Sequence, residues 1–595
     1  MNTETKQCQN CKQNFTIEPE DFQFYEKMKV PAPTFCPECR MIRRLAYRNE
    51  RALYKRACDL CKKDKILMFP QDGPYKVYCK ECWYSDTWDP KSYAMEYDFS
   101  KSFFEQFKDL LLKVPRLGQI HQGYIVNSDY ANRVSDQKNS YLVYGSTGSE
   151  NCRYGVWLNA AKECMDCYNA QKSERCYECI DCFQSNNLAY SQECTSSSNS
   201  WFLFNCRNCQ NCFGCVNLRN KGYCIFNKQY TKEEYEKIIK QFNLGSSLAL
   251  DGMRTKFKDL QKKYIVPSMV INHSNNSSGN WIQDCKDTFK SFNVRNLEGS
   301  RYCFSVFDAK DVMDYCHWGN TSERVYEASS NGIQCADMRF TNECWAQAIN
   351  LEYCSNCPGS KNLFGCIGLR NAEYCIFNKQ YSKEEFEALV PKIRAQMMEI
   401  PYLTEKGRQY RYGEFFPIEI SPFAYNETVA QEFFPITKSE AIERGYPWRD
   451  PEKKNYKITL IADLIPDHVK DAPDGITNEV IGCAHEGKCN HQCTTAFRIL
   501  AEELATYKQA SLPLPRLCPN CRHYERLKQR NPMRLWPRKC QCAGSASENG
   551  VYANVANLHP SHKPNEHCPN EFQTSYSPES GQIVYCVECY QVEVV

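Results

Sequence analysis

Residues 206–215 read CRNCQNCFGC, with a cysteine at every third position. The spacing extends well beyond this stretch, because all twelve cysteines between residues 125 and 224 fall in the same frame of three. A period of three matches neither a free-standing α-helix nor an ordinary strand. It predicts a narrow solenoid in which every third side chain points inward and only small residues fit. These cysteines are Cys152, Cys164, Cys167, Cys176, Cys179, Cys182, Cys194, Cys206, Cys209, Cys212, Cys215 and Cys224.

A longer period of twelve residues is superimposed on the first and predicts rungs of about twelve residues with four inward positions. One such rung is Cys164-x2-Cys167-x2-Ala170-x2-Ser173. Cysteine packs as a small hydrophobe, so we expect stacked reduced thiols here, with disulfides and metal binding as the alternatives. Positions twelve apart are Cys152, Cys164, Cys176, Leu188, Ser200, Cys212 and Cys224.

The predicted rung resembles the coil of the beetle antifreeze β-helix, which also points Cys, Ser and Ala inward at three-residue steps. The resemblance is one of rung geometry only. The flat Thr-x-Thr face of that protein is missing, so antifreeze activity is not implied.

A second block repeats the first at an offset of 151 residues. Asn362–Glu387 aligns with Asn211–Glu236, but the frame of three slips by one residue several times, as between Val312 and Cys316. We therefore expect a second, less regular solenoid. Each block ends in a capping-box pattern that predicts a helix covering the open end of the solenoid. The two patterns are Thr231-x2-Glu234 and Ser382-x2-Glu385.

The N-terminal residues carry four C-x2-C pairs, the pattern of zinc knuckles. A knuckle places two thiolates on one turn, and two knuckles complete a closed tetrahedral site. Pairing adjacent knuckles is the simplest grouping, although an interleaved pairing is possible. The predicted zinc ligands are Cys8, Cys11, Cys36 and Cys39 for the first site, and Cys58, Cys61, Cys79 and Cys82 for the second.

The C-terminal residues repeat this plan at an offset of 482, where Tyr25–Cys58 aligns with Tyr507–Cys540. The repeat predicts two further sites and about four Zn2+ per chain. Competing ligands leave both C-terminal sets open: Cys483, His485 and His491 beside Cys489 in the third, and Cys568, His559, His562 and His567 in the fourth. The predicted ligands are Cys489, Cys493, Cys518 and Cys521, then Cys540, Cys542, Cys586 and Cys589.

A basic segment follows the first ribbon at each end. Seven Lys or Arg residues face one acid between Cys39 and Cys58, and the same balance holds between Cys521 and Cys540. Arginines four apart form a stripe on a helix, and such a stripe beside a rigid zinc site predicts phosphate contacts. The alternative is a solvated face that pairs with the protein's own acids. The two stripes are Arg40, Arg44 and Arg48, and Arg522, Arg526 and Arg530.

The 595 residues carry a net charge of only +3, so any signal for nucleic acid is local. The sequence has no stretch typical of a signal peptide or a membrane span, which predicts a soluble, cytoplasmic protein without membrane contact. Phosphate-binding and hydrolase patterns such as GxGxxG, the P-loop, GxSxG and HExxH are absent.

The run C-x2-C-x3-F…FY…P-x2-CP-x-CR at Cys8–Arg40 resembles a small zinc-ribbon domain. The whole layout resembles the long cysteine-rich zinc-ribbon proteins of candidate-phyla bacteria, most specifically in CPECRMIRRLAYRNE and GCVNLRNKGYCIFNKQYTKEE. The resemblance implies zinc and a cytoplasmic location; it implies no particular activity.

Together these patterns predict a multidomain, mainly β protein in which zinc ribbons at both ends flank a duplicated narrow β-solenoid with short helices. The expected units are zinc ribbon 1 with its basic helix (1–57), zinc ribbon 2 with an amphipathic helix (58–120), solenoid block 1 (121–230), a helical connector (231–287), solenoid block 2 (288–380), a helix with an irregular linker domain (381–475), and a double zinc ribbon (476–595).

The function that the sequence favours is that of a zinc-binding, non-enzymatic protein that contacts RNA, DNA or a ribonucleoprotein through its arginine stripes. A protein–protein interaction scaffold is the first alternative. A zinc enzyme is the least favoured, because four-thiolate sites have no open coordination position; its one candidate is the His/Cys cluster at residues 559–568. The sequence gives no indication of the oligomeric state.

Overall fold

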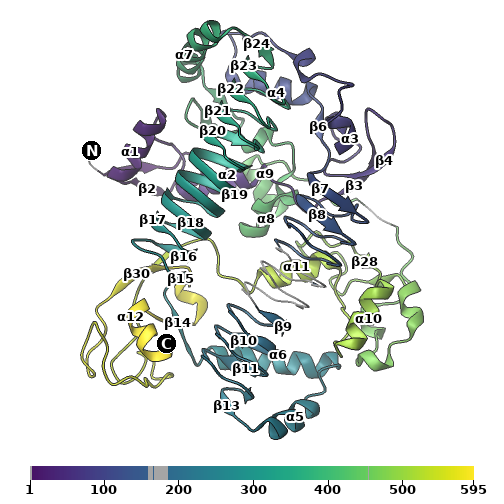
Figure 1. Cartoon of the computed structure of the whole chain (residues 1–595), viewed down its shortest axis with the longest axis vertical. Helices are drawn as coiled ribbons and strands as arrows, with labels where there is room; N and C mark the ends of the chain where they lie inside the picture. Colours follow the sequence, from purple (N-terminus) through teal and green to yellow (C-terminus); the bar gives the residue numbers. More distant parts are fainter. Residues whose placement is uncertain (1–2, 158–164, 166–184, 453–454) are drawn as a thin grey trace.

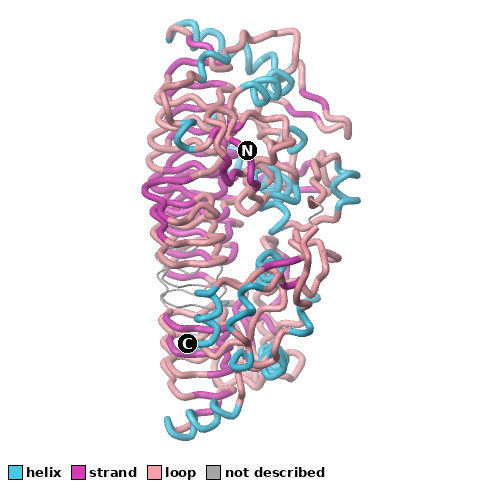
Figure 2. The backbone as a smooth tube through the Cα atoms, turned by 90° about the vertical axis from the view of Figure 1, so that its right-hand side faces the viewer, coloured by secondary structure: helices cyan, strands magenta, loops and turns pink. Residues whose placement is uncertain are grey.

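The computed structural model describes residues 3–157, 165, 185–452 and 455–595. It is mainly β, with two solenoids of parallel rungs in the middle of the chain (Figure 1). The rungs stack in a long column with helices at its two ends (Figure 2). The first solenoid includes β7 (His121–Val126), β8 (Val134–Lys138), β9 (Asn186–Ala189), β10 (Ser198–Phe204), β11 (Phe213–Val216), β12 (Cys224–Ile225) and β13 (Lys228–Gln229).

The second solenoid is also built mainly from parallel strands, and β19 winds through more than one rung without interruption. In Figure 1 the first solenoid descends from β7 to β13, whereas the second rises from β15 to β24. Its strands are β15 (Ile271–Asn272), β16 (Gly279–Gln283), β17 (Lys286–Phe289), β18 (Ser291–Arg301), β19 (Phe304–Gly332), β20 (Ala336–Asn342), β21 (Ile349–Glu352), β22 (Lys361–Phe364), β23 (Glu373–Ile376) and β24 (Lys379–Gln380).

The strand register confirms rungs of about twelve residues. In the first solenoid Ser198 pairs with Asn186. In the second the step is eleven residues where Ile271 pairs with Ile282, and thirteen where Glu323 pairs with Ala336. The expected irregularity of the second block is therefore confirmed. Stacked rungs begin at β15, so the second solenoid starts before residue 288 and the helical connector is shorter than predicted.

The period of three has a backbone origin. In the first solenoid the residue before each inward position repeatedly adopts a left-handed conformation, with φ near +50° at Asn205, Asn208 and Asn211. Asparagine tolerates this conformation better than most residues. Its side chain also bonds to the equivalent position one rung away, as in the 2.7 Å contact from Asn208 Nδ2 to Asn220 Oδ1. These two effects explain why asparagine is common beside the cysteine positions.

The inward cysteines are buried thiols. Cys206, Cys209, Cys212 and Cys215 have no exposed surface, and the Cys209 thiol donates to the carbonyl of Arg207 at 3.4 Å. No disulfide joins two of the described cysteines. The predicted inward residues 164, 167, 176, 179 and 182 lie outside the described residues.

The size limit on inward side chains gives a stability prediction. Cys212→Leu should lower the free energy of unfolding of the solenoid by about 1–3 kcal/mol, because extra methylenes overpack the narrow interior. Cys212→Ser should cost less, since Ser200 fills the equivalent slot one rung earlier and accepts from the Cys212 N–H at 2.9 Å. Urea titration of both variants checks this ordering; a leucine variant as stable as the serine variant would contradict it.

Helices begin at both predicted capping boxes. α5 (Lys232–Gln241) starts after Thr231 and α7 (Lys383–Glu399) after Ser382, each with reciprocal cap hydrogen bonds. The amphipathic helix expected within residues 58–120 is α4 (Phe103–Lys113), which packs Phe103 against Phe364 of the second solenoid. α6 (Ser247–Gln261) packs on the first solenoid, where Phe257 contacts Phe202.

The two ends of the chain fold as related ribbons. The N-terminal elements are β1 (Glu4–Gln7), β2 (Asn14–Ile17), α1 (Pro19–Met28), α2 (Pro37–Leu45), β3 (Tyr54–Ala57), β4 (Asp64–Leu67), β5 (Val77–Tyr78), α3 (Lys80–Trp83) and β6 (Arg116–Leu117). The C-terminal elements are β27 (Ile481–Gly482), β28 (Ala496–Phe497), α10 (Ala501–Gln509), α11 (Pro519–Leu527), β29 (Trp536–Lys539), β30 (Glu571–Thr574), β31 (Ile583–Tyr585) and α12 (Val587–Val594).

Each pair of ribbons contacts the segment that leads into one solenoid through a short pair of strands. β5 pairs with β6 just before the first solenoid, and β31 pairs with β14 (Ile265–Pro267) just before the second. The sequence repeat between the two ends therefore corresponds to a repeat in tertiary structure. Among the described helices, none has the length and apolar character needed to span a bilayer.

Candidate metal centres and central cleft

The N-terminal cysteines gather in two groups of four, in the adjacent pairing that the sequence favours. In each group the four sulfur atoms lie within 4.8 Å of one another. The Sγ atoms of Cys11 and Cys36 are 3.7 Å apart, and those of Cys61 and Cys79 are 4.0 Å apart. A disulfide needs about 2.05 Å. Four thiolates at about 2.3 Å from a central zinc would lie about 3.8 Å apart, so the spacing fits a tetrahedral metal site.

Backbone N–H groups point at these sulfur atoms. The amide of Cys36 donates to Cys8 Sγ at 3.3 Å, and that of Cys79 donates to Cys58 Sγ at 3.2 Å. Burial acts to raise the pKa of Cys58, but backbone hydrogen bonds from Cys79, Cys61 and Leu60 outweigh it and lower the pKa to about 7. A thiol held near its thiolate form is ready to bind a metal.

The C-terminal centres have a different ligand set from the one predicted. Cys483 joins Cys493, Cys518 and Cys521 in the third centre, and Cys489 lies in an adjoining group. Cys568 joins Cys540, Cys586 and Cys589 in the fourth centre, in place of Cys542. The alternatives that the sequence left open, Cys483 and Cys568, are therefore the residues that complete these groups.

The backbone explains the exchange at the third centre. The amide of Cys518 donates to Cys483 Sγ at 3.3 Å, which reproduces the contact from Cys36 to Cys8 in the N-terminal ribbon. Cys483 is thus the structural counterpart of Cys8, although the sequence alignment placed Cys489 there. At the fourth centre, Cys540 and Cys542 are too close in sequence to form a knuckle, and Cys542 turns toward His559.

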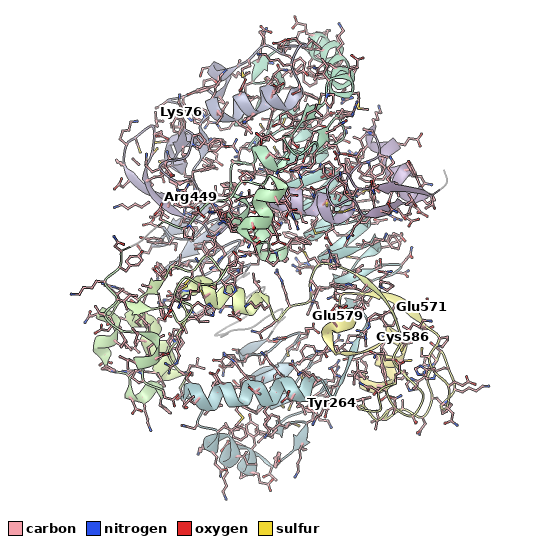
Figure 3. All side chains as sticks on the ribbon, turned by 180° about the vertical axis from the view of Figure 1, so that it is seen from behind. Lys76, Tyr264, Arg449, Glu571, Glu579 and Cys586 are labelled. Carbon is pink, nitrogen blue, oxygen red and sulfur yellow. The ribbon has the colours of Figure 1, made fainter. Side chains whose placement is uncertain are left out.

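The fourth centre lies in the C-terminal part of the molecule, where Figure 3 shows Cys586. Lys76, which lies between Cys61 and Cys79 of the second N-terminal centre in sequence, is on the opposite side in the same view. These two centres therefore lie in separate regions of the molecule.

Arg40 and Arg44 of the first arginine stripe are buried and so do not form a surface for phosphate. The side chains of Arg40 and Arg44 are 2% and 0% exposed. Arg40 donates to Asp314 on β19 at 2.9 Å, and Arg44 contacts Asp314 and Glu327 at 3.0 Å. Arg48 is bonded to Glu50 and Ser330. The predicted alternative, pairing with the protein's own acids, is the arrangement found here, in the interior and not on a solvated face.

Arg43 belongs to the same buried network. It donates to Glu327 at 2.7 Å and to Glu414 at 2.9 Å. Burial acts to lower the pKa of the Arg43 guanidinium, but Glu327 and Glu414 outweigh it and hold the pKa above its usual value. The network fixes α2 against the second solenoid.

The second stripe is also turned inward. Arg522 donates to the hydroxyl of Tyr507 at 2.9 Å and lies over the ring of Tyr154 in the first solenoid. Arg526 is buried, and Arg530 covers the ring of Phe433 at 3.5 Å. A phosphate cannot reach the buried guanidinium groups of Arg522 and Arg526.

A cleft of about 590 Å³ lies between the two solenoids. The second solenoid contributes three half-buried aromatic side chains, Trp281, Phe307 and Trp318. The first contributes Arg133 and Arg207 along with small hydroxyl residues. The cleft therefore combines flat aromatic faces with basic groups.

The charge of the cleft lining is positive. Its described walls carry four arginines and one acid, Glu343, which pairs with Arg133. His317 is 4% exposed, and neither of its ring nitrogens has a hydrogen-bond partner among the described residues. Burial holds the pKa of His317 well below its usual value. These features suit a ligand that is anionic and brings its own hydrogen-bonding groups. The four arginines are Arg48, Arg133, Arg207 and Arg295.

Sequence reasoning missed this cleft. Its walls come from two blocks that face one another only in the folded chain, and the slipping frame of the second block hides the alignment of its aromatic residues. A weak signal is present, because Trp318 follows Trp281 by about three rungs, a spacing that favours the same face of a solenoid for both indoles.

Comparisons with known proteins give no family. No protein-family model matches the chain, and no curated protein matches it. Among solved structures, it is similar to one described as a "putative acetyltransferase" from Desulfovibrio desulfuricans G20, at 8% identity over 52% of this chain and 81% of that chain. The TM-score is 0.11, so this similarity carries no argument about fold or activity.

Proposed function

We propose that this protein is a zinc-stabilised binding protein that holds a short segment of single-stranded nucleic acid in the cleft between its solenoids. The observation that carries the proposal is the pairing of half-buried Trp281, Phe307 and Trp318 with arginines across a single cleft. Of the six arginines in the two stripes, Arg48 lines the cleft and the other five have no part in it.

Zinc is the metal that best suits the four cysteine centres. Tetrahedral sets of four thiolates favour Zn2+ or an iron–sulfur site, whereas Mg2+ and Ca2+ prefer oxygen ligands. The N–H donors of Cys36 and Cys79 are typical of zinc knuckles, and these centres have no open coordination position for catalysis. Their role in the proposal is structural.

The cleft chemistry matches single-stranded nucleic acid in two ways. Aromatic side chains stack on bases whatever their sequence, and arginines contact the backbone phosphates. Arg207 is exposed at the cleft, and the guanidinium of Arg295 lies 5.7 Å from the centre of the Phe307 ring. A duplex would hide its base faces from these rings, so the proposed ligand is single-stranded.

The test measures fluorescence anisotropy of labelled poly(U) and poly(dT) oligonucleotides with the full-length protein. We expect binding that weakens steeply as salt rises. Trp281→Ala should weaken binding about 5- to 150-fold, the loss of one base stack, or about 1–3 kcal/mol.

Tyr124→Ala is the matched control, because Tyr124 is an exposed aromatic residue on β7 that does not line the cleft. It should leave affinity unchanged. Equal losses in the two variants, or no oligonucleotide binding at low salt, would contradict the proposal. Salt-independent binding of a neutral oligosaccharide in the cleft would replace nucleic acid with sugar as the ligand.

A further inference from the structure

Each C-terminal metal centre has a second group of potential ligands beside it. In the N-terminal ribbons the first two ligands of each centre are separated by only two residues, as in Cys8-x2-Cys11. In the C-terminal ribbons that gap is filled by residues 484–492 and residues 541–567. Each insertion carries one cysteine and at least two histidines. Residues 1–120 contain no histidine.

In the third centre, the insertion brings its ligands back to Cys521. His485, Cys489, His491 and Cys521 have donor atoms within 4.8 Å of one another. Cys489 Sγ lies 3.6 Å from Cys521 Sγ, close to the spacing of two thiolates on one zinc. The Nδ1 atoms of His485 and His491 are buried, without hydrogen-bond partners in the described chain. Cys521 is therefore shared between two groups of four.

The fourth centre repeats the arrangement around Cys589. Cys542 Sγ lies 3.5 Å from His559 Nδ1, and Cys589 Sγ lies 3.4 Å from His562 Nε2. A tetrahedral zinc with Zn–S near 2.3 Å and Zn–N near 2.05 Å would place such atoms about 3.6 Å apart. The thiol of Cys589 also lies within hydrogen-bond distance of Cys542.

The histidines of the fourth centre are oriented like metal ligands. His559 Nε2 lies 3.1 Å from Glu593 Oε1, and His562 Nδ1 lies 3.0 Å from the carbonyl of Lys563. An oxygen acceptor on the far nitrogen fixes the tautomer and leaves the near nitrogen free to bind a metal. Both rings present that near nitrogen to a cysteine sulfur.

We infer that each C-terminal ribbon holds a binuclear zinc cluster in which one thiolate, Cys521 or Cys589, bridges the two ions. This inference rests on the proposed zinc binding and deepens it. The second ion of the third centre takes His485, Cys489, His491 and the bridge; that of the fourth takes Cys542, His559, His562 and the bridge. With one ion in each N-terminal ribbon, the chain binds about six Zn2+, not about four.

The clusters explain how the two insertions fold. Most of residues 541–567 is turn and irregular structure, with little regular hydrogen bonding of its own. A second metal supplies the fixed points that such a loop otherwise lacks. In this arrangement protein side chains fill every coordination position of the second ion in each ribbon. The His/Cys cluster at residues 559–568 is therefore a structural zinc site and not a catalytic zinc site with an open coordination position.

The first test counts zinc in the full-length protein by mass spectrometry of the metal, with protein quantified by amino-acid analysis. We expect about six ions per chain. A value near four would overturn the binuclear clusters while leaving the four thiolate centres in place, and a value near zero would overturn zinc binding altogether. The zinc count therefore distinguishes failure of the binuclear clusters from failure of zinc binding itself.

Variants locate the additional ions. His491→Ala and His562→Ala should each lose about one zinc, whereas the control His567→Ala, an exposed histidine in the same insertion as His562, should keep all of them. If a variant fails to fold, wild-type protein loaded with 113Cd2+ decides the question. Bridging thiolates should give two pairs of scalar-coupled cadmium resonances; well-resolved resonances without coupling would overturn the bridges.

Discussion

Glu327→Gln should destabilise the protein by about 3–5 kcal/mol, one of the largest effects expected from any single substitution in the chain. The carboxylate of Glu327 is fully buried between β19 and α2, where it accepts from Arg43 at 2.7 Å and from Arg44 at 3.0 Å. Glutamine keeps the shape but removes the charge. The guanidinium groups of Arg43 and Arg44 then remain buried with one carboxylate fewer to balance their charge.

The effect is large because removing one partner of a buried ion network costs far more than the complete network contributes. A complete buried ion network adds little net stability, because desolvation offsets most of the Coulomb attraction. Removing one partner keeps the desolvation cost and loses the attraction. The remaining acids, Asp314 and Glu414, cannot replace Glu327, since each is already bonded to an arginine.

Glu298→Gln is the matched control. Glu298 lies on β18 of the same solenoid and pairs with Lys286 and Lys310 through side chains that are about half exposed. Exposed pairs contribute little, so this variant should stay within about 0.5 kcal/mol of wild type. Urea unfolding of both variants measures the difference, and a loss at Glu327 no larger than at Glu298 would show that α2 is held by apolar packing alone.

The solenoid could be predicted from the sequence because its rule is local. A narrow interior admits one small side chain every third residue, and that restriction is visible at Cys206, Cys209, Cys212 and Cys215 without knowledge of any distant contact. The N-terminal metal groups were predictable for the same reason, since both ligands of a knuckle lie on one turn.

The burial and pairing of the stripe arginines could not be predicted, because their partners are distant in sequence. Asp314 lies 274 residues after Arg40, at a point where the frame of the second block slips. The slip of the three-residue frame can be seen in the sequence, but its structural consequence cannot. The irregular rungs direct Asp314 and Glu327 to the face that α2 covers. A basic helix looks the same in sequence whether it faces phosphate or buried carboxylates.

The grouping of the C-terminal cysteines differs from the predicted one for a related reason. Alignment with the N-terminal ribbon matched Cys489 to Cys8 by proximity, whereas backbone geometry gives that place to Cys483, beyond the insertion. Sequence spacing alone cannot show which of two cysteines receives the amide of Cys518.

Removal of metal should unfold the ribbons and leave the solenoids folded. Structural zinc contributes about 10–16 kcal/mol to small zinc domains, far more than the short hairpins β1–β2 and β3–β4 can supply by themselves. The solenoids hold their rungs by strand hydrogen bonds and inward packing, and their described cysteines are buried.

Hydrogen exchange before and after chelation measures this difference along the chain. Amides of β1 to β4 and of residues 541–567 should lose protection, whereas those of β10, β11 and β22 should keep most of theirs. Returning Zn2+ should restore the ribbons, which separates metal loss from irreversible damage. If the ribbons of fully metal-free protein keep their protection, their cysteines act only as core residues. If the solenoids lose protection as well, unfolding of the ribbons is transmitted to them through the buried arginine network, because α2 lies between its metal centre and β19.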